Sequence, residues 1–289
     1  MTAVLGIGNA TLDIIHQVES YPRENDEIRC SSRLLRCGGN TANTLIVLGQ
    51  LGPDCYWAGT LVDDVDGQLV ADGLRCHGID LGAAQWFGSG SMPVSSVVLS
   101  KQSGSRTITH FRDLPEYPLA AFEAIDLRAY DWLHFEGRNI ANVRQMLASA
   151  RQHTRPLRCS LEVEKPREGV ENLFPLVDVL LFSRHYAVSQ GFTDPLSLLR
   201  SVHAVCPGVD LFCAWGEQGA AALDRAGNEY RQAAVVPSRV VDTLGAGDTF
   251  NAGIINGYLE VQDIDELLAC ACRLAGIKCA QDGLDGLTG

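Results

Sequence analysis

The sequence predicts one α/β domain with a doubly wound, mainly parallel sheet, helices on both faces of that sheet, and a small second β-sheet. From residue 120 onward, apolar segments alternate with segments of helical spacing, which is typical of a parallel sheet covered on both faces. The chain has 289 residues, of which 46% are hydrophobic, and this composition suits one large core. Two β-branched stretches between residues 90 and 112 flank a short polar turn and predict the second sheet.

In the first part of the chain, short apolar or alternating stretches predict strands, and longer periodic stretches predict helices. The predicted strands are residues 4–8, 12–18, 27–35, 55–59, 93–99 and 106–111. The predicted helices are residues 40–51 and 64–76. The last two strands form a hairpin across Gln102, Ser103 and Gly104 in this interpretation.

In the second part, apolar segments and helical segments alternate regularly. The predicted strands are residues 131–135, 158–163, 177–182 and 209–215, followed by a hairpin of 219–223 and 229–234. The predicted helices are residues 140–152, 168–174, 184–190, 194–205, 246–259 and 263–281. Ligands of a doubly wound sheet bind beyond the carboxyl ends of its strands, so motifs at strand-to-helix turns carry most weight.

Charge and motif content exclude several classes of protein. The formal net charge of −12 repels a phosphate backbone, so we expect no nucleic-acid partner. The uncharged run 81–100 is rich in Gly and Ser and contains Pro93, and the N-terminus lacks a basic region, so we expect a cytoplasmic protein without a membrane segment. None of the three lysines follows a glycine, which excludes a P-loop, and the H-E-x-x-H and G-x-S-x-G signatures are absent from the sequence.

The ten cysteines are expected to be reduced, because the chain is long and several of them lie in apolar runs. No C-x-x-C pair occurs, and Cys270, Cys272 and Cys279 lack partners at the usual spacings of a metal site. The sequence therefore predicts no metal cluster and leaves any protein ligands of a metal unknown.

The strongest motif runs from Asp242 to Phe250 and contains Gly245, Ala246, Gly247 and Asp248 just before a helical pattern. A glycine-rich turn at a helix start exposes backbone N–H groups at the positive end of the helix dipole, which can hold a phosphate. Asp248 in the first helical turn could take the proton of a hydroxyl that attacks phosphorus. The alternative is structural: the glycines form a tight turn and Asp248 satisfies backbone donors.

A second motif comprises Gly38, Gly39, Asn40 and Asn43. The glycine pair allows close approach of the backbone to a ligand, and the two carboxamides, three residues apart, share a helix face. With the carboxylate of Asp13 they could bind several sugar hydroxyls, although a capped helix start explains the motif equally well. For Glu136, Arg138, Glu164 and Lys165 we favour a structural network of paired charges, and for His134 a hydrogen-bonded position in the core.

With both motifs, the chain resembles the ribokinase-like (PfkB) carbohydrate kinases, and the resemblance implies one ribokinase-like domain over residues 1–289. Several stretches look like the ketohexose kinases of this family, namely residues 21–22, 27–30, 103–108, 136–139, 162–168, 213–220 and 239–248. The implied activity is ATP-dependent phosphorylation of a ketohexose, D-fructose at its 1-hydroxyl, with Mg²⁺ and with activation by K⁺. Insertions at about 13–36 and 90–112 would form a β lid, and two lids would clasp a homodimer.

The resemblance also implies roles for single residues. Asp248 is the base and touches the sugar, and the turn Gly245 to Gly247 is the anion hole. The implied sugar-binding residues are Asp13, Gly39, Asn40, Asn43 and Asp248. The implied nucleotide-binding residues are Arg106, Gly216, Glu217, Gln218, Gly219, Gly245, Gly247 and Cys272.

The chain departs from the family pattern at several positions. Ser183 to Tyr186 stand where many members carry an N-x-x-E motif that organises Mg²⁺, and Asn25, Gly216 and Gln218 replace an Asp, an Ala and a Glu of the ketohexose kinases. A kinase for another sugar or a nucleoside therefore remains an alternative, as does a non-catalytic sugar sensor on the same fold. A dinucleotide-dependent oxidoreductase is a distant alternative, because Gly6 to Thr11 matches only part of the G-x-G-x-x-G fingerprint.

Overall fold

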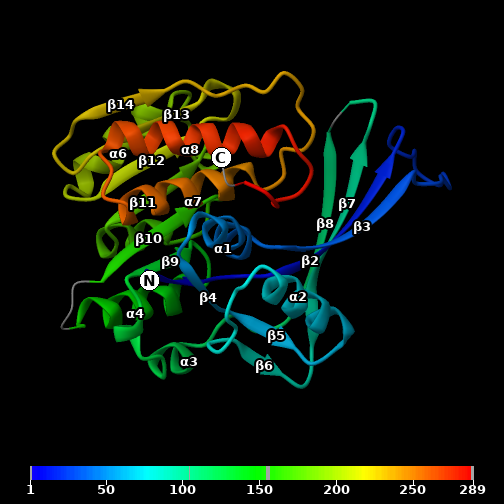
Figure 1. The fold of residues 1–289 in the computed structure, drawn as a ribbon, viewed down its shortest axis with the longest axis horizontal. Coiled ribbons are helices and arrows are strands. Elements are labelled where there is room, and N and C mark those ends of the chain that lie inside the picture. The colour runs from blue at the N-terminus through cyan, green and yellow to red at the C-terminus, as the bar shows by residue number, and fades with distance from the viewer. Residues whose placement is uncertain (1, 104, 154–156, 288–289) are drawn as a thin grey trace.

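The fold is an α/β body from which a second β-sheet projects on one side (Figure 1). The structure is a computed structural model and describes residues 2–103, 105–153 and 157–287. Both the doubly wound sheet and the small extra sheet predicted from the sequence are confirmed. Gly104, which the sequence places in a hairpin turn, lies outside the described residues. In the described part of the chain, no helix is long and apolar enough to cross a membrane.

The central sheet, as far as the structure describes the chain, has eight strands. Their order is β14 (Glu229–Gln232), β13 (Ala220–Leu223), β12 (Asp210–Ala214), β11 (Val179–Ser183), β10 (Arg158–Val163), β9 (Trp132–Glu136), β1 (Ala3–Ile7) and β4 (Asp54–Ala58). Strands β12 to β4 pair in parallel, and β13 and β14 add an antiparallel edge. The strand order reverses between β1 and β9, so the carboxyl ends of these strands mark the ligand edge.

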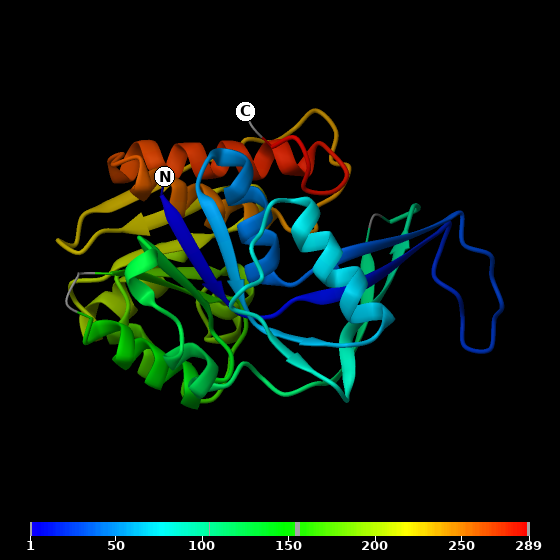
Figure 2. The same cartoon turned by 60° about the horizontal axis from the view of Figure 1, so that its bottom comes forward.

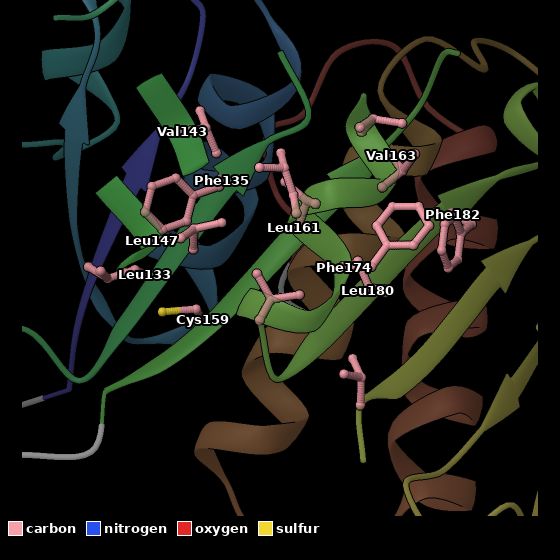
Figure 3. Close-up of a cluster of buried hydrophobic side chains, with 14 of the residues drawn as sticks. Leu133, Phe135, Val143, Leu147, Cys159, Leu161, Val163, Phe174, Leu180 and Phe182 are labelled. Carbon is pink, nitrogen blue, oxygen red and sulfur yellow. The ribbon is translucent and has the colours of Figure 1, made fainter. Parts of the chain in front are cut away.

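The central strands are buried on both faces, which explains their nearly continuous apolar sequences. Leu133 and Phe135 of β9 and Leu161 of β10 point toward the helical layer that contains Val143 and Leu147 (Figure 3). Trp132 points to the opposite face, where its indole nitrogen donates to Ser160 at 2.8 Å.

Two helical layers enclose the sheet (Figure 2). One layer contains α1 (Asn40–Leu51), α7 (Ala246–Leu259) and α8 (Ile264–Cys279). The other contains α3 (Leu119–Glu123), α4 (Ile140–Arg151), α5 (Arg184–Ser189) and α6 (Pro195–Val205). α1 follows β3 in the chain and packs against α7, and the starts of the two helices meet at the ligand edge.

The second sheet has the order β3 (Ser32–Gly38), β2 (Thr11–Val18), β7 (Ser91–Ser100) and β8 (Arg106–Asp113), and α2 (Val65–Cys76) packs beside it. We call it the four-stranded sheet. Its register aligns Asp13 with Arg36, Ser95 and His110 in one row across the sheet. Because strand side chains alternate between faces, this polar row shares a face with the row of Ile15, two residues further along β2.

The structure corrects two local predictions and adds short elements that were not predicted. The strand predicted at 27–35 is β3, which begins at Ser32, because β2 ends at Val18 and has no residue level with the exposed residues 27–30. The helix predicted at 168–174 is the 3₁₀ segment Val170–Leu176, which contains Pro175. The short strands β5 (Thr60–Val62) and β6 (Gln85–Phe87) and the helix α3 were not predicted, since three to five residues give no clear period.

Candidate active site

The turn that leads into α7 presents backbone amides to open space. Gly245 is the N-cap of α7 with φ of 81°, and no side chain among the described residues caps this helix start. Asp242 shapes the turn by accepting the N–H of Leu244 on Oδ1 at 2.9 Å. Gly247 is exposed, and a Cβ placed there would meet nothing within 4 Å. This geometry suits an anion held against the positive end of the helix dipole.

Asp248 lies one residue beyond this turn and is almost completely buried, with 7% of its surface exposed. Its Oδ2 accepts a hydrogen bond of 2.7 Å from Nδ2 of Asn43 on α1. Burial is the main cause that raises the pKa of Asp248 to about 8, with a further contribution from the nearby carboxylates Glu164, Glu136 and Asp13 and against the lowering effect of Asn43. A carboxyl group with such a pKa can accept and release a proton near neutral pH.

The start of α1 brings the second motif to the same place. Gly39 has φ of 104°, and a Cβ there would lie 2.3 Å from the carbonyl oxygen of Asn9, so only glycine fits. Asn40 and Asn43 point to different partners: Nδ2 of Asn40 donates to Glu162 and Glu164, at 3.1 Å each. In this arrangement both amide hydrogens of Asn40 are used, which leaves its oxygen to accept from a ligand.

Glu162 is a site residue that sequence reasoning did not single out. Its Oε1 accepts from Asn40, whereas its Oε2 is buried without a hydrogen-bond partner among the described residues. Burial raises the pKa of Glu162 well above its usual value, and the nearby carboxylates of Asp248, Glu136 and Glu164 raise it further. Its position at the end of a buried strand was the available signal, because a charged residue there faces the ligand edge.

Asp13 lies on β2 of the four-stranded sheet and is buried, with Oδ1 accepting from Thr11 at 2.8 Å. Burial raises its pKa, while hydrogen bonds from Thr11 and Ser95 lower it. Ser95 contacts His110, whose pKa is lowered by partial burial and by nearby arginines. Ser95 and His110 gave no signal in the sequence, since only the pairing of β2, β7 and β8 aligns them with Asp13.

Cavities lie on this side of the molecule. One of about 570 Å³ separates the four-stranded sheet from residues 240–244 and is lined by Arg36 and Arg106. Another of about 260 Å³ is lined by Asp13, Asn43 and Leu284. The larger one falls within the usual volume range of small-molecule sites, about 300–1,000 Å³.

The charged residues at the strand ends form pairs. Arg138 contacts Glu136 at 3.3 Å and Glu116 at 2.7 Å, and Lys165 contacts Glu164 at 3.3 Å. Glu136 also accepts the backbone N–H of Asn9 at 2.9 Å, which ties β1 to β9 at the ligand edge. The predicted structural network is therefore present as two separate sets of ion pairs.

His134 is completely buried, and its Nδ1 lies 2.9 Å from the hydroxyl of Ser160, as expected for a core histidine. Burial lowers its pKa to about 4, so the ring is neutral near pH 7. Its Nε2 has no partner among the described residues.

The predicted nucleotide-binding residues lie at four places: the start of β8, the turn after β12, the start of α7, and α8. Arg106 at the start of β8 is exposed and donates to the hydroxyl of Thr243 at 3.1 Å, beside the anion-hole turn. Gly216, Glu217 and Gln218 form a 3₁₀ turn after β12 (Gly216–Gln218) that ends at Gly219. Glu217 is paired with Arg184 at 3.0 Å, and Gln218 lines a cavity of about 140 Å³.

Cys272 lies on α8 with 5% of its surface exposed, and burial raises the pKa of its thiol to about 11. It is therefore a neutral apolar side chain. The same helix packs closely on residues 233–236, because a Cβ on Gly276 would lie 2.2 Å from the carbonyl oxygen of Val235. All ten cysteines are free.

The partial dinucleotide fingerprint at Gly6 to Thr11 has a different structural setting. The stretch leads from β1 directly into β2, so a strand follows it where the fingerprint requires a helix. Gly8 is needed here for packing, since a Cβ would lie 2.1 Å from the hydroxyl of Thr41.

The chain is similar along nearly its whole length to known carbohydrate kinases. Residues 1–287 match the pfkB family of carbohydrate kinases. The chain is 39% identical over 293 residues to ketohexokinase of Mus musculus, with 98% of each chain covered. It is 23% identical over 291 residues to ribokinase of Bacillus subtilis, covering 99% of this chain and 96% of that one.

Solved structures share the fold. Ribokinase from Giardia lamblia matches with a TM-score of 0.85 and 16% identity, covering 100% of this chain and 97% of that chain. Arabidopsis thaliana ribokinase complexed with ribose and ATP matches with a TM-score of 0.78 and 20% identity, covering 98% and 94%.

A glycine-rich helix start beside a buried carboxyl group, at the ligand edge of this fold, can hold a phosphate and accept a proton, as an enzyme that transfers a phosphoryl group requires. The chain belongs to the pfkB family of carbohydrate kinases, and it is thus an ATP-dependent sugar kinase. The family predicted from the two motifs is confirmed.

Proposed function

We propose that this enzyme phosphorylates a ketohexose, D-fructose, at its 1-hydroxyl. The observation that carries the proposal is the 2.7 Å hydrogen bond between Asn43 and Asp248, which joins the two motifs at the start of α7. The 39% identity to mouse ketohexokinase along nearly the whole chain supports the choice of sugar.

In the proposed reaction, the oxygen of the sugar hydroxyl attacks the γ-phosphorus of ATP while Asp248 takes the hydroxyl proton, and the bond from the γ-phosphorus to the β,γ-bridging oxygen breaks so that ADP leaves. The amides of Gly245, Ala246 and Gly247 stabilise the charge on the transferring phosphoryl group. The sugar lies between Asp13 on the four-stranded sheet and Gly39, Asn40 and Asn43 at the start of α1. Buried groups that hydrogen-bond a hydroxyl discriminate strongly against sugars that lack it.

For the nucleotide, we propose contacts from Arg106, Gly216, Glu217, Gln218, Gly219, Gly245, Gly247 and Cys272. Mg²⁺ would bridge the phosphates and neutralise their charge. Among the described residues no group of three or more His, Cys, Asp or Glu side chains is arranged to hold a metal, so the phosphates and water would supply most ligands of Mg²⁺.

We further propose that the chain is a single ribokinase-like domain whose four-stranded sheet acts as a lid and as the contact surface of a homodimer. Exposed apolar residues gather on this sheet, namely Leu34, Leu35, Ile108 and Phe111. Reduced thiols and the need for ATP make the cytoplasm the proposed compartment.

The test is an ADP-release assay with Mg-ATP and a panel of fructose, tagatose, ribose, glucose, fructose 1-phosphate and adenosine. We expect turnover of fructose, with NMR identifying the product as the 1-phosphate. Turnover of another substrate alone would overturn the sugar assignment while leaving the kinase activity intact. Sugar binding without turnover of any substrate would favour the non-catalytic sensor.

A further inference from the structure

Lys278 near the end of α8 is completely buried, with 0% of its surface exposed, whereas Lys101 and Lys165 are exposed. Its ammonium donates to the carbonyl oxygen of Asp242 at 2.9 Å, to Oδ2 of Asp242 at 3.0 Å and to the carbonyl oxygen of Gln281 at 3.4 Å. An ammonium group has three donors, so all of them are used.

Stability alone is a weak reason for such a group. Removing an ammonium from water is unfavourable, and a buried ion pair often stabilises a fold no better than apolar residues of similar volume. The position of Lys278 suggests a different role, because both of its Asp242 contacts lie at the start of the turn that leads to Gly245.

Asp242 connects Lys278 to the anion hole. Its Oδ1 accepts the N–H of Leu244 at 2.9 Å, and its Oδ2 accepts the N–H of Gly283 at 3.4 Å. The segment after α8 also supports the turn directly, since a Cβ on Gly245 would lie 3.1 Å from the side chain of Leu284. Arg36 of the four-stranded sheet reaches the same Oδ2 at 3.5 Å. Without the ammonium, the Asp242 carboxylate would keep one distant cationic partner, and Asp242 would lose both of its hydrogen bonds to α8.

We propose that Lys278 is a positioning residue that serves as a tethered monovalent cation for the anion-hole turn, so that no free K⁺ is needed there. Two carbonyl oxygens and a carboxylate are hard oxygen donors of the kind that an alkali cation uses. The ammonium occupies them with the same charge, and it would repel a second cation. This inference rests on the proposed role of the turn, and it opposes the K⁺ activation that the family resemblance implies.

The first experiment measures kcat for the wild-type enzyme in KCl and in tetramethylammonium chloride at equal ionic strength. We expect the two values to differ by less than about twofold, well below the 10²–10³-fold effect of losing one oxyanion-hole donor. A wild-type enzyme that needs K⁺ for most of its turnover would overturn the proposal.

The second experiment uses Lys278→Ala, which leaves space for a small cation, with Arg273→Met as the control. Arg273 is exposed on the same helix, so its replacement removes one charge without touching the turn. We expect Lys278→Ala to lower kcat by roughly 10²-fold and to change the KM for sugar little, with about tenfold recovery in NH₄⁺ or K⁺.

Thermal unfolding gives a readout that needs neither sugar nor ATP. KCl or NH₄Cl should raise the Tm of Lys278→Ala relative to tetramethylammonium chloride and leave wild type and Arg273→Met unchanged. A Lys278→Ala enzyme with normal kcat would overturn the proposal. If Lys278→Ala does not fold, the kcat of Lys278→Met and the cation dependence of the wild-type kcat still test the proposal. Failure of fructose turnover in wild type would instead concern the proposed substrate.

Discussion

Asp248 is a buried carboxyl group that must lose its proton before it can act as a base. Its pKa is raised to about 8 by burial and by neighbouring carboxylates, and the usual value of 3.8 applies once the chain unfolds. A raised pKa in the folded state means that the folded form binds the proton more tightly. The contribution of this proton binding to the free energy of unfolding is fully present below pH 3.8 and is lost as the pH rises toward 8.

Replacing Asp248 by Asn should therefore remove activity and increase stability. We expect Asp248→Asn to lower kcat by about 10²–10⁴-fold, the usual contribution of a general base. The Tm of Asp248→Asn should exceed that of wild type by an amount that grows from pH 5 to pH 8. Each kcal/mol of difference in the free energy of unfolding corresponds to about 2–4 °C in Tm. Scanning calorimetry across pH checks this, with Asp72→Asn on the exposed face of α2 as a control. A Tm difference that does not change with pH would contradict the raised pKa.

Glu164 is one of the carboxylates that raise the pKa of Asp248. In Glu164→Gln the negative charge is lost, while an oxygen remains that can accept from Asn40. We expect the rising limb of kcat/KM against pH, which reports the free enzyme, to move to lower pH. Glu168→Gln changes an exposed charge four residues away and should leave the profile in place. If the rising limb of the pH profile of Glu164→Gln does not move, the Glu164 carboxylate is not a cause of the raised pKa of Asp248.

The sequence could identify Asp248 and Asn43 as candidates because each belongs to a compact motif. It could not predict that the two side chains touch, since 205 positions separate them. The partners of Asn40 and the unpaired oxygen of Glu162 were equally hidden, because they depend on how α1 packs over the ends of β9 and β10. Charged residues that pair with each other look the same in a sequence as charged residues that contact a ligand.

Among the elements, α7 begins where the proposed reaction needs exposed amides and where folding needs a cap. Gly245 has a positive φ. Gly247 lies in the first helical turn, does not have a positive φ, and faces open space. A methyl group at residue 247 would meet no protein atom within 4 Å, but it would intrude where the phosphoryl group is proposed to lie.

Gly247→Ala should thus separate folding from function. Alanine is better than glycine in a helix by about 0.5–1 kcal/mol, so the Tm should stay equal or rise. We expect kcat to fall by about 10²-fold or more, as for the loss of one oxyanion-hole donor. Gly88→Ala, also exposed and without neighbours within 4 Å, is the matched control. Normal kinetics in Gly247→Ala would show that the phosphoryl group does not lie against this helix start.

Long periodic elements such as α7, α8 and the strands of the central sheet were predictable, because burial imposes a clear pattern on them. The four-stranded sheet was predictable in outline only. The start of β3 depends on where β2 ends, and the strand pair β5 and β6 consists of three residues on each side. Such short elements form because the surrounding fold brings them together, not because of their own sequence.

In the whole molecule, the four-stranded sheet projects from the α/β body and would be only marginally stable if nothing covered it (Figure 2). One row across it is apolar: Ile15 pairs with Leu34 and Val97, and Val97 pairs with Ile108. Leu34 and Ile108 at the ends of this row are 40% and 46% exposed. This row shares a face with Asp13, so a partner that covers it would also cover the proposed sugar site.

A charge in this row should dissociate the proposed homodimer. We expect Ile108→Glu to shift the mass measured by light scattering from twice 31.2 kDa to 31.2 kDa. Because the lid would then lose its support, the KM for sugar should rise by about tenfold or more, with a smaller change in KM for ATP. Val205→Glu, at an exposed apolar position at the end of α6, is the control and should stay dimeric. A wild-type enzyme that is monomeric at all concentrations would contradict the proposed homodimer. The four-stranded sheet would then have to close over the sugar without a partner.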